Sequence, residues 1–163
     1  MIKKEFTIAI DVFNSIEELQ EKDKLLCEAA VNALNNSHSP YSNFKVGAAI
    51  RLQSGHVLYG SNQENVAYPS GLCAERVALF HAGANYPDDA VESIAITAQT
   101  NSFEILNPIT PCGSCLQVLA EYEKKQKASI TVLMYCINGQ IWKGRGIETF
   151  LPFLFFEDKL AKQ

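Results

Sequence analysis

The spacing of apolar residues near the start of the chain predicts an edge strand followed by a helix. Residues 5–13 read EFTIAIDVF and alternate between polar and apolar positions over most of their length, which is typical of a strand. The helix is predicted to begin at Ser15, because Glu18 three positions later completes a capping-box pattern. Its apolar positions are Leu19, Leu25, Leu26, Ala29, Ala30, Ala33 and Leu34.

The remaining pattern predicts two hairpins, one further strand and three further helices. The expected elements are strands over 45–52 and 56–62, a helix from about Cys73, a strand over 92–99, a helix from about Cys112, strands over 129–136 and 139–144, and a short helix within 147–155. The hairpins are indicated by Gly55 in the first connection and by Asn138-Gly139, a dipeptide favoured in tight turns, in the second. This order predicts a mixed sheet with helices packed on it, an α/β layer fold.

The chain is expected to form a single domain over residues 1–163. Its length is about that of one domain, and it contains no internal repeat, low-complexity tract or linker. Residues 1–14, which precede the first predicted helix, are interpreted as a possible N-terminal extension of that domain.

Composition and charge narrow the class of partner. Apolar residues make up 47% of the chain and charged residues 20%, as in an ordinary globular protein. The net charge is −4, and the only basic run is Lys124, Lys125 and Lys127, whereas a nucleic-acid polymer calls for a basic stripe. No apolar stretch approaches the ~20 residues of a membrane span, and the first residues lack a secretory pattern. We therefore expect a cytoplasmic location, a small-molecule substrate, and neither nucleic acid nor membrane as partner.

Five cysteines in such a chain favour metal binding or thiol chemistry over a disulfide framework. Cys112 and Cys115 form a CxxC motif at a predicted loop-to-helix boundary. On its own this motif is compatible with two packed thiols, with a redox dithiol of the thioredoxin type, or with a metal site that needs a further ligand. Cys73, which also precedes a predicted helix, is the candidate for that ligand.

Two helix starts that meet at one place suit a zinc ion held by three thiolates. Such a complex carries a charge of −1, which the amide dipoles of helix N-termini stabilise. Arg76, one turn into the helix from Cys73, is expected to donate to a ligand sulfur and to offset more of this charge. Three protein ligands leave the fourth tetrahedral position open, as in a catalytic zinc site.

Glu75 is the candidate general acid and base of this site. On a helix it lies about 200° around the axis from Cys73, so the two side chains converge only beyond the helix end. Because Glu75 falls in the first turn, it is expected to reach past that end towards water at the metal without being a ligand.

These residues carry a resemblance to a known family. The CAE sequence at 73–75, followed by PCGSC at 111–115, resembles the zinc signature of cytidine deaminases. Four blocks, PYSNFKVGAAI, GSNQENVAYPSGLCAERVAL, PCGSCLQVL and FLPFLF, are similar in order to the small homotetrameric cytidine deaminases and cover roughly residues 25–155. The resemblance implies a three-layer α/β/α fold, a mixed β-sheet with helices on both faces.

The resemblance also implies an activity and a set of roles. The activity is hydrolytic deamination of cytidine and deoxycytidine to uridine and deoxyuridine in pyrimidine salvage, with one Zn²⁺ per chain held by Cys73, Cys112 and Cys115. Phe44 is implied to contact the pyrimidine, Asn62 and Glu64 to bind the ribose hydroxyls, and the backbone of Ala74 to hold the base edge. Tyr68 and Phe155 are implied to reach into the sites of neighbouring subunits of a homotetramer.

Several positions keep a simpler interpretation beside the functional one. Without the family, Phe44 reads as ordinary core, and Asn62 and Glu64 as residues that cap turns. Cys27 and Cys136 are expected to be packed thiols, and the three histidines show no spacing that suggests a ligand set. Leu116 departs from the family, which commonly has Arg directly after the second cysteine of the CxxC motif. Arg76 is then expected to balance the thiolate charge with less help.

Other functions remain open from the sequence. A close alternative is a deaminase of another cytosine nucleoside, such as an antibiotic of the blasticidin S type. A thioredoxin-like oxidoreductase would use Cys112 and Cys115 and leave Cys73 and Glu75 without a role. A structural zinc module would need a fourth ligand, for which Cys136 is the obvious candidate.

Overall fold

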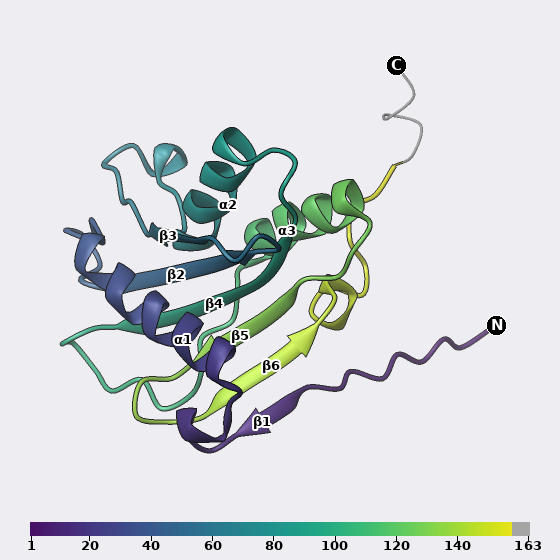
Figure 1. Cartoon of the computed structure of the whole chain (residues 1–163), viewed down its shortest axis with the longest axis horizontal. Helices are drawn as coiled ribbons and strands as arrows, with labels where there is room; N and C mark the ends of the chain where they lie inside the picture. Colours follow the sequence, from purple (N-terminus) through teal and green to yellow (C-terminus); the bar gives the residue numbers. More distant parts are fainter. Residues whose placement is uncertain (158–163) are drawn as a thin grey trace.

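A computed structural model describes residues 1–157 of the chain, which form a six-stranded sheet covered by helices on both faces (Figure 1). The strand order is β1-β6-β5-β4-β2-β3, and β4 and β5 are parallel whereas the other neighbours are antiparallel. The strands are β1 (Asp11–Phe13), β2 (Lys45–Leu52), β3 (Val57–Ser61), β4 (Val91–Gln99), β5 (Thr131–Tyr135) and β6 (Ile141–Arg145). The helices are α1 (Glu21–Ala33), α2 (Ala74–Asn85) and α3 (Gly113–Gln126), with short 3₁₀ helices at Ile16–Glu18, Leu34–Asn36, Tyr68–Ser70 and Ile147–Thr149.

The three layers follow from the alternation of side chains along buried strands. On β2, Ala48 and Ile50 face the core beneath α2 and α3, whereas Ala49 faces the core beneath α1. Helix α1 covers one face of the sheet, and α2 and α3 cover the other (Figure 1). The predicted three-layer α/β/α fold, a mixed sheet with helices on both faces, is confirmed.

Two glycines allow helices to lie directly on the sheet. A Cβ atom on Gly47 of β2 would lie 2.1 Å from the carbonyl oxygen of Ala30 in α1. A Cβ atom on Gly60 of β3 would lie 2.2 Å from the carbonyl oxygen of Ala74, at the start of α2. Neither contact is sterically possible for a larger residue without movement of the helix, so these glycines set the distance between the layers.

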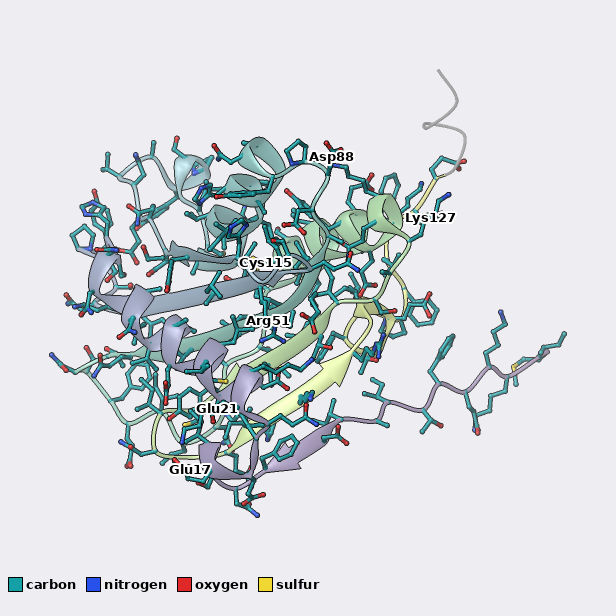
Figure 2. The ribbon with its side chains drawn as sticks, in the orientation of Figure 1. Glu17, Glu21, Arg51, Asp88, Cys115 and Lys127 are labelled. Atoms are coloured by element: carbon teal, nitrogen blue, oxygen red, sulfur yellow. The ribbon has the colours of Figure 1, made fainter. Side chains whose placement is uncertain are left out.

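A buried carboxylate joins the α1 layer to the sheet. Asp23 of α1 accepts from the guanidinium of Arg51 on β2 at 3.2 Å and from the ammonium of Lys143 on β6 at 2.8 Å. Arg51 also donates to the carbonyl oxygen of Lys22 in the first turn of the helix. Figure 2 labels Arg51, which lies beside α1. A buried acid with two cationic partners holds the orientation of the helix on its face of the sheet.

The beginning of the chain differs in part from the prediction. Of residues 5–13 only Asp11–Phe13 pair with the sheet, where Val12 of β1 lies opposite Trp142 of β6. Residues 1–10 continue beyond the sheet from β1 (Figure 1), and the Phe6 ring contacts that of Phe153 with centroids 5.0 Å apart. The helix predicted from Ser15 begins instead at Glu21.

Local capping and core packing compete at this point. The hydroxyl of Ser15 accepts from the backbone N–H of Glu17 at 3.2 Å and caps only the 3₁₀ turn Ile16–Glu18. Leu19 is then extended and buried, and Ile16 packs against the same core cluster. The turn is therefore bent into the core before α1 starts.

The predicted helix within residues 147–155 is also shorter than expected. Only Ile147–Thr149 form a 3₁₀ turn, and the chain beyond Phe150 contains no helix among the described residues. Pro152 removes a backbone donor and restricts the residue before it, which prevents the turn from continuing. Nowhere in residues 1–157 is a helix long and apolar enough to span a membrane.

Candidate active site

Cys73 and Cys112 occupy equivalent positions at the starts of α2 and α3. Each is the residue before the first helical one, with extended backbone angles and no hydrogen bond from its side chain to the helix end. Each carbonyl oxygen accepts the first bond of its helix, from Val77 at 3.1 Å and from Leu116 at 2.9 Å. The thiols are therefore free to face a common point, next to backbone amides that favour negative charge.

The thiols of Cys73, Cys112 and Cys115 form one cluster. The Sγ atoms of Cys73 and Cys112 are 3.8 Å apart, those of Cys112 and Cys115 are 3.4 Å apart, and all three lie within 4.8 Å of one another. Tetrahedral zinc with Zn–S bonds of about 2.3 Å places its sulfurs about 3.8 Å apart, so the spacing fits a three-thiolate zinc site. Figure 2 shows Cys115 in the interior of the molecule, between the helices and the sheet.

The proton balance of the cluster favours a thiolate at Cys73. A hydrogen bond from Cys115, with a further one from Arg76, lowers the pKa of Cys73 to about 5. The pKa of the Cys115 thiol is raised, first by its hydrogen bond to Cys73 and then by burial. Arg76 donates from Nη2 to the Cys73 sulfur at 3.6 Å, which is the contact expected from the sequence.

The charge around these sulfurs is supplied unequally by the two helices. Among the hydrogen bonds of residues 1–157, that of Arg76 is the one from a cationic side chain to a sulfur of the cluster. Leu116 is buried in the apolar core beneath α2 and α3. The residue after the second cysteine of the CxxC motif is thus a core side chain where the resemblance led us to expect an arginine, and Arg76 contributes the positive charge on the α2 side.

Glu75, the second residue of α2, is 4% exposed and lines the same cavity as Cys73 and Cys112. Burial raises the pKa of its carboxyl group, so the carboxyl binds a proton more readily than an exposed glutamate. The first turn of α2 therefore brings a thiol and a proton-exchanging carboxyl to one space, although they lie on different sides of the helix axis.

The cavity has a volume of about 570 Å³, which suits a small molecule. Four of the six residues expected to bind substrate line it together with Cys73 and Cys112: Phe44, Asn62, Glu64 and Tyr68. Thr110 and Ile109 line it as well and were missed by the sequence reasoning. Their only sequence signal is that they directly precede the PCGSC motif.

Asn62 and Glu64 already hold the loop that frames the cavity. The Asn62 Oδ1 accepts from the Ser37 hydroxyl at 2.6 Å and the Val46 amide at 2.8 Å, while Nδ2 donates to the Phe44 carbonyl oxygen at 2.9 Å. The Glu64 carboxylate accepts from the backbone of Tyr41 and Ser42 and from the Ser42 hydroxyl, and the hydroxyl contact is the main cause of its lowered pKa. Glu64 therefore caps the turn at Tyr41 and Ser42, as the simpler interpretation expected, whereas Asn62 holds the start of β2 through Phe44 and Val46. One Nδ2 hydrogen of Asn62 is left over.

Two expected substrate contacts lie elsewhere. Ala74 is fully buried as the first residue of α2, and its methyl group does not belong to the cavity wall. Phe155 is 72% exposed and outside the cavity of its own chain. Its backbone is held by the Gln117 side chain, whose Nε2 donates to the Phe155 oxygen at 2.9 Å and whose Oε1 accepts from the Phe155 amide at 3.1 Å.

The other two cysteines are packed thiols. Cys27 is buried in the core beneath α1, and Cys136 donates to the backbone oxygen of Ile105 at 3.1 Å. Within residues 1–157 the three-thiol cluster does not include Cys136, which removes the candidate fourth ligand of a structural zinc module. Interpretation of the CxxC motif as a thioredoxin-like dithiol does not explain why a third thiol, that of Cys73, lies beside it and accepts a hydrogen bond from Arg76.

Comparison with known proteins agrees with this geometry. Residues 20–131 match the family described as cytidine and deoxycytidylate deaminase zinc-binding region. A cytidine deaminase of Halalkalibacterium halodurans is 42% identical over 98 residues, covering 60% of this chain and 70% of the relative. One of Sporosarcina psychrophila is 34% identical over 142 residues, covering 85% of this chain and 94% of the relative.

Solved structures give the same result. The crystal structure of a cytidine deaminase from Burkholderia pseudomallei superposes with a TM-score of 0.67 at 37% identity, covering 80% of this chain and 97% of that one. That of a cytidine deaminase from Mycobacterium tuberculosis gives a TM-score of 0.62 at 26% identity, covering 82% and 96%.

The fold and the cluster thus define a zinc-binding α/β domain with an open catalytic cavity. The chain belongs to the cytidine and deoxycytidylate deaminase family, and zinc is its cofactor.

Proposed function

We propose that this chain is a zinc-dependent enzyme that hydrolyses cytidine and deoxycytidine to uridine and deoxyuridine and releases ammonia. The observation that carries the proposal is the buried carboxyl of Glu75 on the same cavity as Cys73 and Cys112, two members of the three-thiol cluster. The two relatives described above align with this chain over most of their own length and are named cytidine deaminases, which supports the substrate class.

The proposed reaction divides between the metal ligands and Glu75. Cys73, Cys112 and Cys115 hold the zinc, which when bound acidifies water enough to supply a hydroxide nucleophile near neutral pH. Glu75 takes one proton of the attacking water and passes it to N3 of the pyrimidine. It then takes the proton of the new hydroxyl group at C4 and gives it to the amino group, which leaves as ammonia. Water and cytidine are consumed, and uridine and ammonia are formed. A carboxyl whose pKa burial raises is suited to hold and release a proton in this way.

Arg76 is proposed to support the metal centre from outside the ligand set. Three thiolates around Zn²⁺ carry a charge of −1, and a guanidinium 3.6 Å from the Cys73 sulfur reduces electron donation by that sulfur. The metal then keeps more of its acidity towards water.

The nucleoside is proposed to lie across the wall formed by Phe44, Asn62 and Glu64. Phe44 offers an aromatic face to the pyrimidine. The backbone of Ala74 is proposed to hold the base edge, because its neighbours Cys73 and Glu75 line the cavity although Ala74 itself does not. Asn62 has one free amide hydrogen and Glu64 has remaining carboxylate lone pairs, which suit the hydroxyl groups of a ribose.

The exposed aromatic residues bear on the assembly of the protein. Tyr68 is 80% exposed at the cavity, and Phe155 is exposed on the C-terminal segment. Large exposed aromatic side chains next to a binding site suit contacts between subunits. We propose a homotetramer in which these two residues reach neighbouring sites, and a cytoplasmic role in pyrimidine salvage. Light scattering of the purified protein gives the subunit number directly.

Activity and metal content together test the proposed function. Purified protein is expected to contain one zinc per chain and to lower the ultraviolet absorbance of cytidine and deoxycytidine as the amino group is lost. Blasticidin S is assayed in parallel. Turnover of blasticidin S without turnover of cytidine would favour the alternative substrate, and a metal-free protein with a redox-active dithiol would refute the proposal.

A further inference from the structure

The loop between β4 and α3 places an exposed aromatic ring on a wall residue of the cavity. Phe103, in this loop, is 61% exposed. Its ring stacks on that of Phe44, with centroids 6.0 Å apart and planes inclined by 23°. An exposed phenylalanine gains little from burial in a core, so its contact with Phe44 is the feature to be explained.

The two rings stand in different relations to the cavity. Phe44 lines it, whereas the described residues of the cavity wall do not include Phe103. Phe103 therefore contacts the Phe44 ring from outside the described cavity wall.

The backbone of Phe44 is fixed independently of its ring. Its amide donates to the Ser42 hydroxyl at 3.0 Å, and its carbonyl oxygen accepts from the Asn62 amide at 2.9 Å. These bonds leave rotation about the side-chain torsions free. The stack with Phe103 is the one aromatic contact given for the Phe44 ring within residues 1–157.

Hydrogen bonds lie on both sides of Phe103, one within the loop and one to the residue that follows β5. The Ser102 amide donates to the Thr100 hydroxyl at 3.2 Å, and the Ile105 carbonyl oxygen accepts from the Cys136 thiol at 3.1 Å. The same loop continues to Cys112 of the metal cluster. A ring held in such a loop can act as a fixed support.

We propose that Phe103 is a positioning residue for the pyrimidine: it holds the Phe44 ring in the orientation that stacks on the base. The inference rests on the proposed deaminase function and on the role of Phe44 within it. Loss of Phe103 leaves the zinc ligands and Glu75 untouched. It therefore weakens nucleoside binding and spares the chemical step.

The test compares kcat and KM for cytidine in Phe103→Ala, Phe103→Leu, Phe103→Tyr, Phe44→Ala and the double variant Phe44→Ala with Phe103→Ala. Loss of the interaction between the two aromatic rings in Phe103→Ala is expected to raise KM about three- to tenfold, with kcat within about twofold of the parent. Phe103→Leu behaves like Phe103→Ala, and Phe103→Tyr keeps the parental KM. Zinc content and thermal midpoint stay unchanged in all of them.

The double variant separates positioning from a general effect of the loop. If Phe103 acts through Phe44, the double variant has the KM of Phe44→Ala alone. Leu106→Ala is the matched control, since Leu106 is 71% exposed in the same loop, and it is expected to keep the parental KM.

The outcomes that overturn the inference are distinct from failure of the proposed function. An active parent with an unchanged KM in Phe103→Ala, or with additive effects in the double variant, refutes the role of Phe103. A zinc-loaded parent that does not deaminate cytidine refutes the proposed function, and the inference with it.

Discussion

At the scale of single residues, the start of α2 gathers a thiol, a buried carboxyl and a guanidinium within the four positions from Cys73 to Arg76. Glu75 has no role as a metal ligand in this arrangement, because the three thiols complete the protein's share of the site. Glu75→Gln is expected to retain one zinc per chain and to lose about 10²–10⁴-fold in kcat, since the amide cannot transfer protons. Zinc analysis and the ultraviolet assay check both parts.

The control for this substitution is Glu121→Gln, an exposed glutamate of α3 that changes the same charge away from the cavity. It is expected to keep the parental kcat. Turnover of Glu75→Gln close to that of the parent would remove Glu75 from its proposed role.

The cysteines give a second test at the same scale. Cys112→Ser is expected to lose most of the zinc after dialysis against a chelator, because two thiolates remain of three. Cys136→Ser is the matched control and is expected to keep one zinc per chain, since the serine hydroxyl can replace the thiol as donor to the Ile105 oxygen. Zinc loss in Cys136→Ser would revive the structural-zinc interpretation.

At this scale, the sequence predicted best those residues whose spacing along the chain determines where their side chains lie. The CxxC motif and its relation to Cys73 and Glu75 gave the cluster, because helix starts fix where such side chains point. The stack of Phe103 on Phe44 joins positions 59 apart through an irregular loop. It leaves no periodic trace in the sequence and could not have been predicted.

At the scale of elements, the position of α2 depends on the glycine beneath it. Gly60→Ala would place a Cβ atom 2.2 Å from the Ala74 oxygen and 2.6 Å from the Ala78 nitrogen. Because both contacts are with backbone, the helix must move, and we expect a loss of about 1–3 kcal/mol in the free energy of unfolding. Urea unfolding measures this loss, and zinc affinity is expected to fall with it because α2 begins next to Cys73.

Gly113→Ala serves as the stability control for this substitution. A Cβ atom there meets nothing within 4 Å, and the residue is the first of α3. Its free energy of unfolding is expected to stay at or slightly above that of the parent. Equal stability of Gly60→Ala and the parent would contradict the close packing of α2 on β3.

Element types were predicted more reliably than element limits. The helix starts near Cys73 and Cys112 were correct, because each follows a loop and opens an apolar run. The start at Ser15 was wrong by six residues, since its capping signal is local whereas the break at Leu19 is imposed by the core. A pattern over three or four residues does not show whether local capping or packing of a side chain into the core will decide where the helix begins.

At the scale of the whole molecule, burial of Cys27 makes stability depend on alkaline pH. Burial, with a smaller contribution from Asp23, raises the pKa of this thiol from 9.0 to about 12. The unfolded chain loses the proton first, so stability is fully present below about pH 9 and falls as pH rises towards 12. The slope expected from this group is about 1.4 kcal/mol per pH unit.

The comparison of the parent with Cys27→Ala isolates this contribution from that of other groups. Urea unfolding at pH 8, 9.5 and 10.5 is expected to show a stability difference between the two proteins that shrinks as pH rises. A difference that stays constant over this range would show that Cys27 does not release its proton on unfolding.

The layered architecture could be predicted from the order of elements, but the strand order could not. The sequences of residues 92–99 and 129–136 do not indicate that these two strands pair in parallel. The helix α3 between them permits such a pairing but does not require it. The sequence likewise predicts an edge strand at the start of the chain, but it does not indicate that this strand pairs with β6 rather than with β3 at the other edge. The division into one domain with an N-terminal extension stays a prediction.

The pairing of Val12 with Trp142 gives the molecule a spectroscopic reporter. Trp142 is the single tryptophan of the chain, half-buried on β6 where β1 covers the sheet edge. Its emission therefore responds to release of the edge strand, while the absorbance of the nucleoside follows chemistry in a cavity whose described wall contains no tryptophan. Detachment of the first residues and turnover can be recorded in the same cuvette, each by its own optical signal.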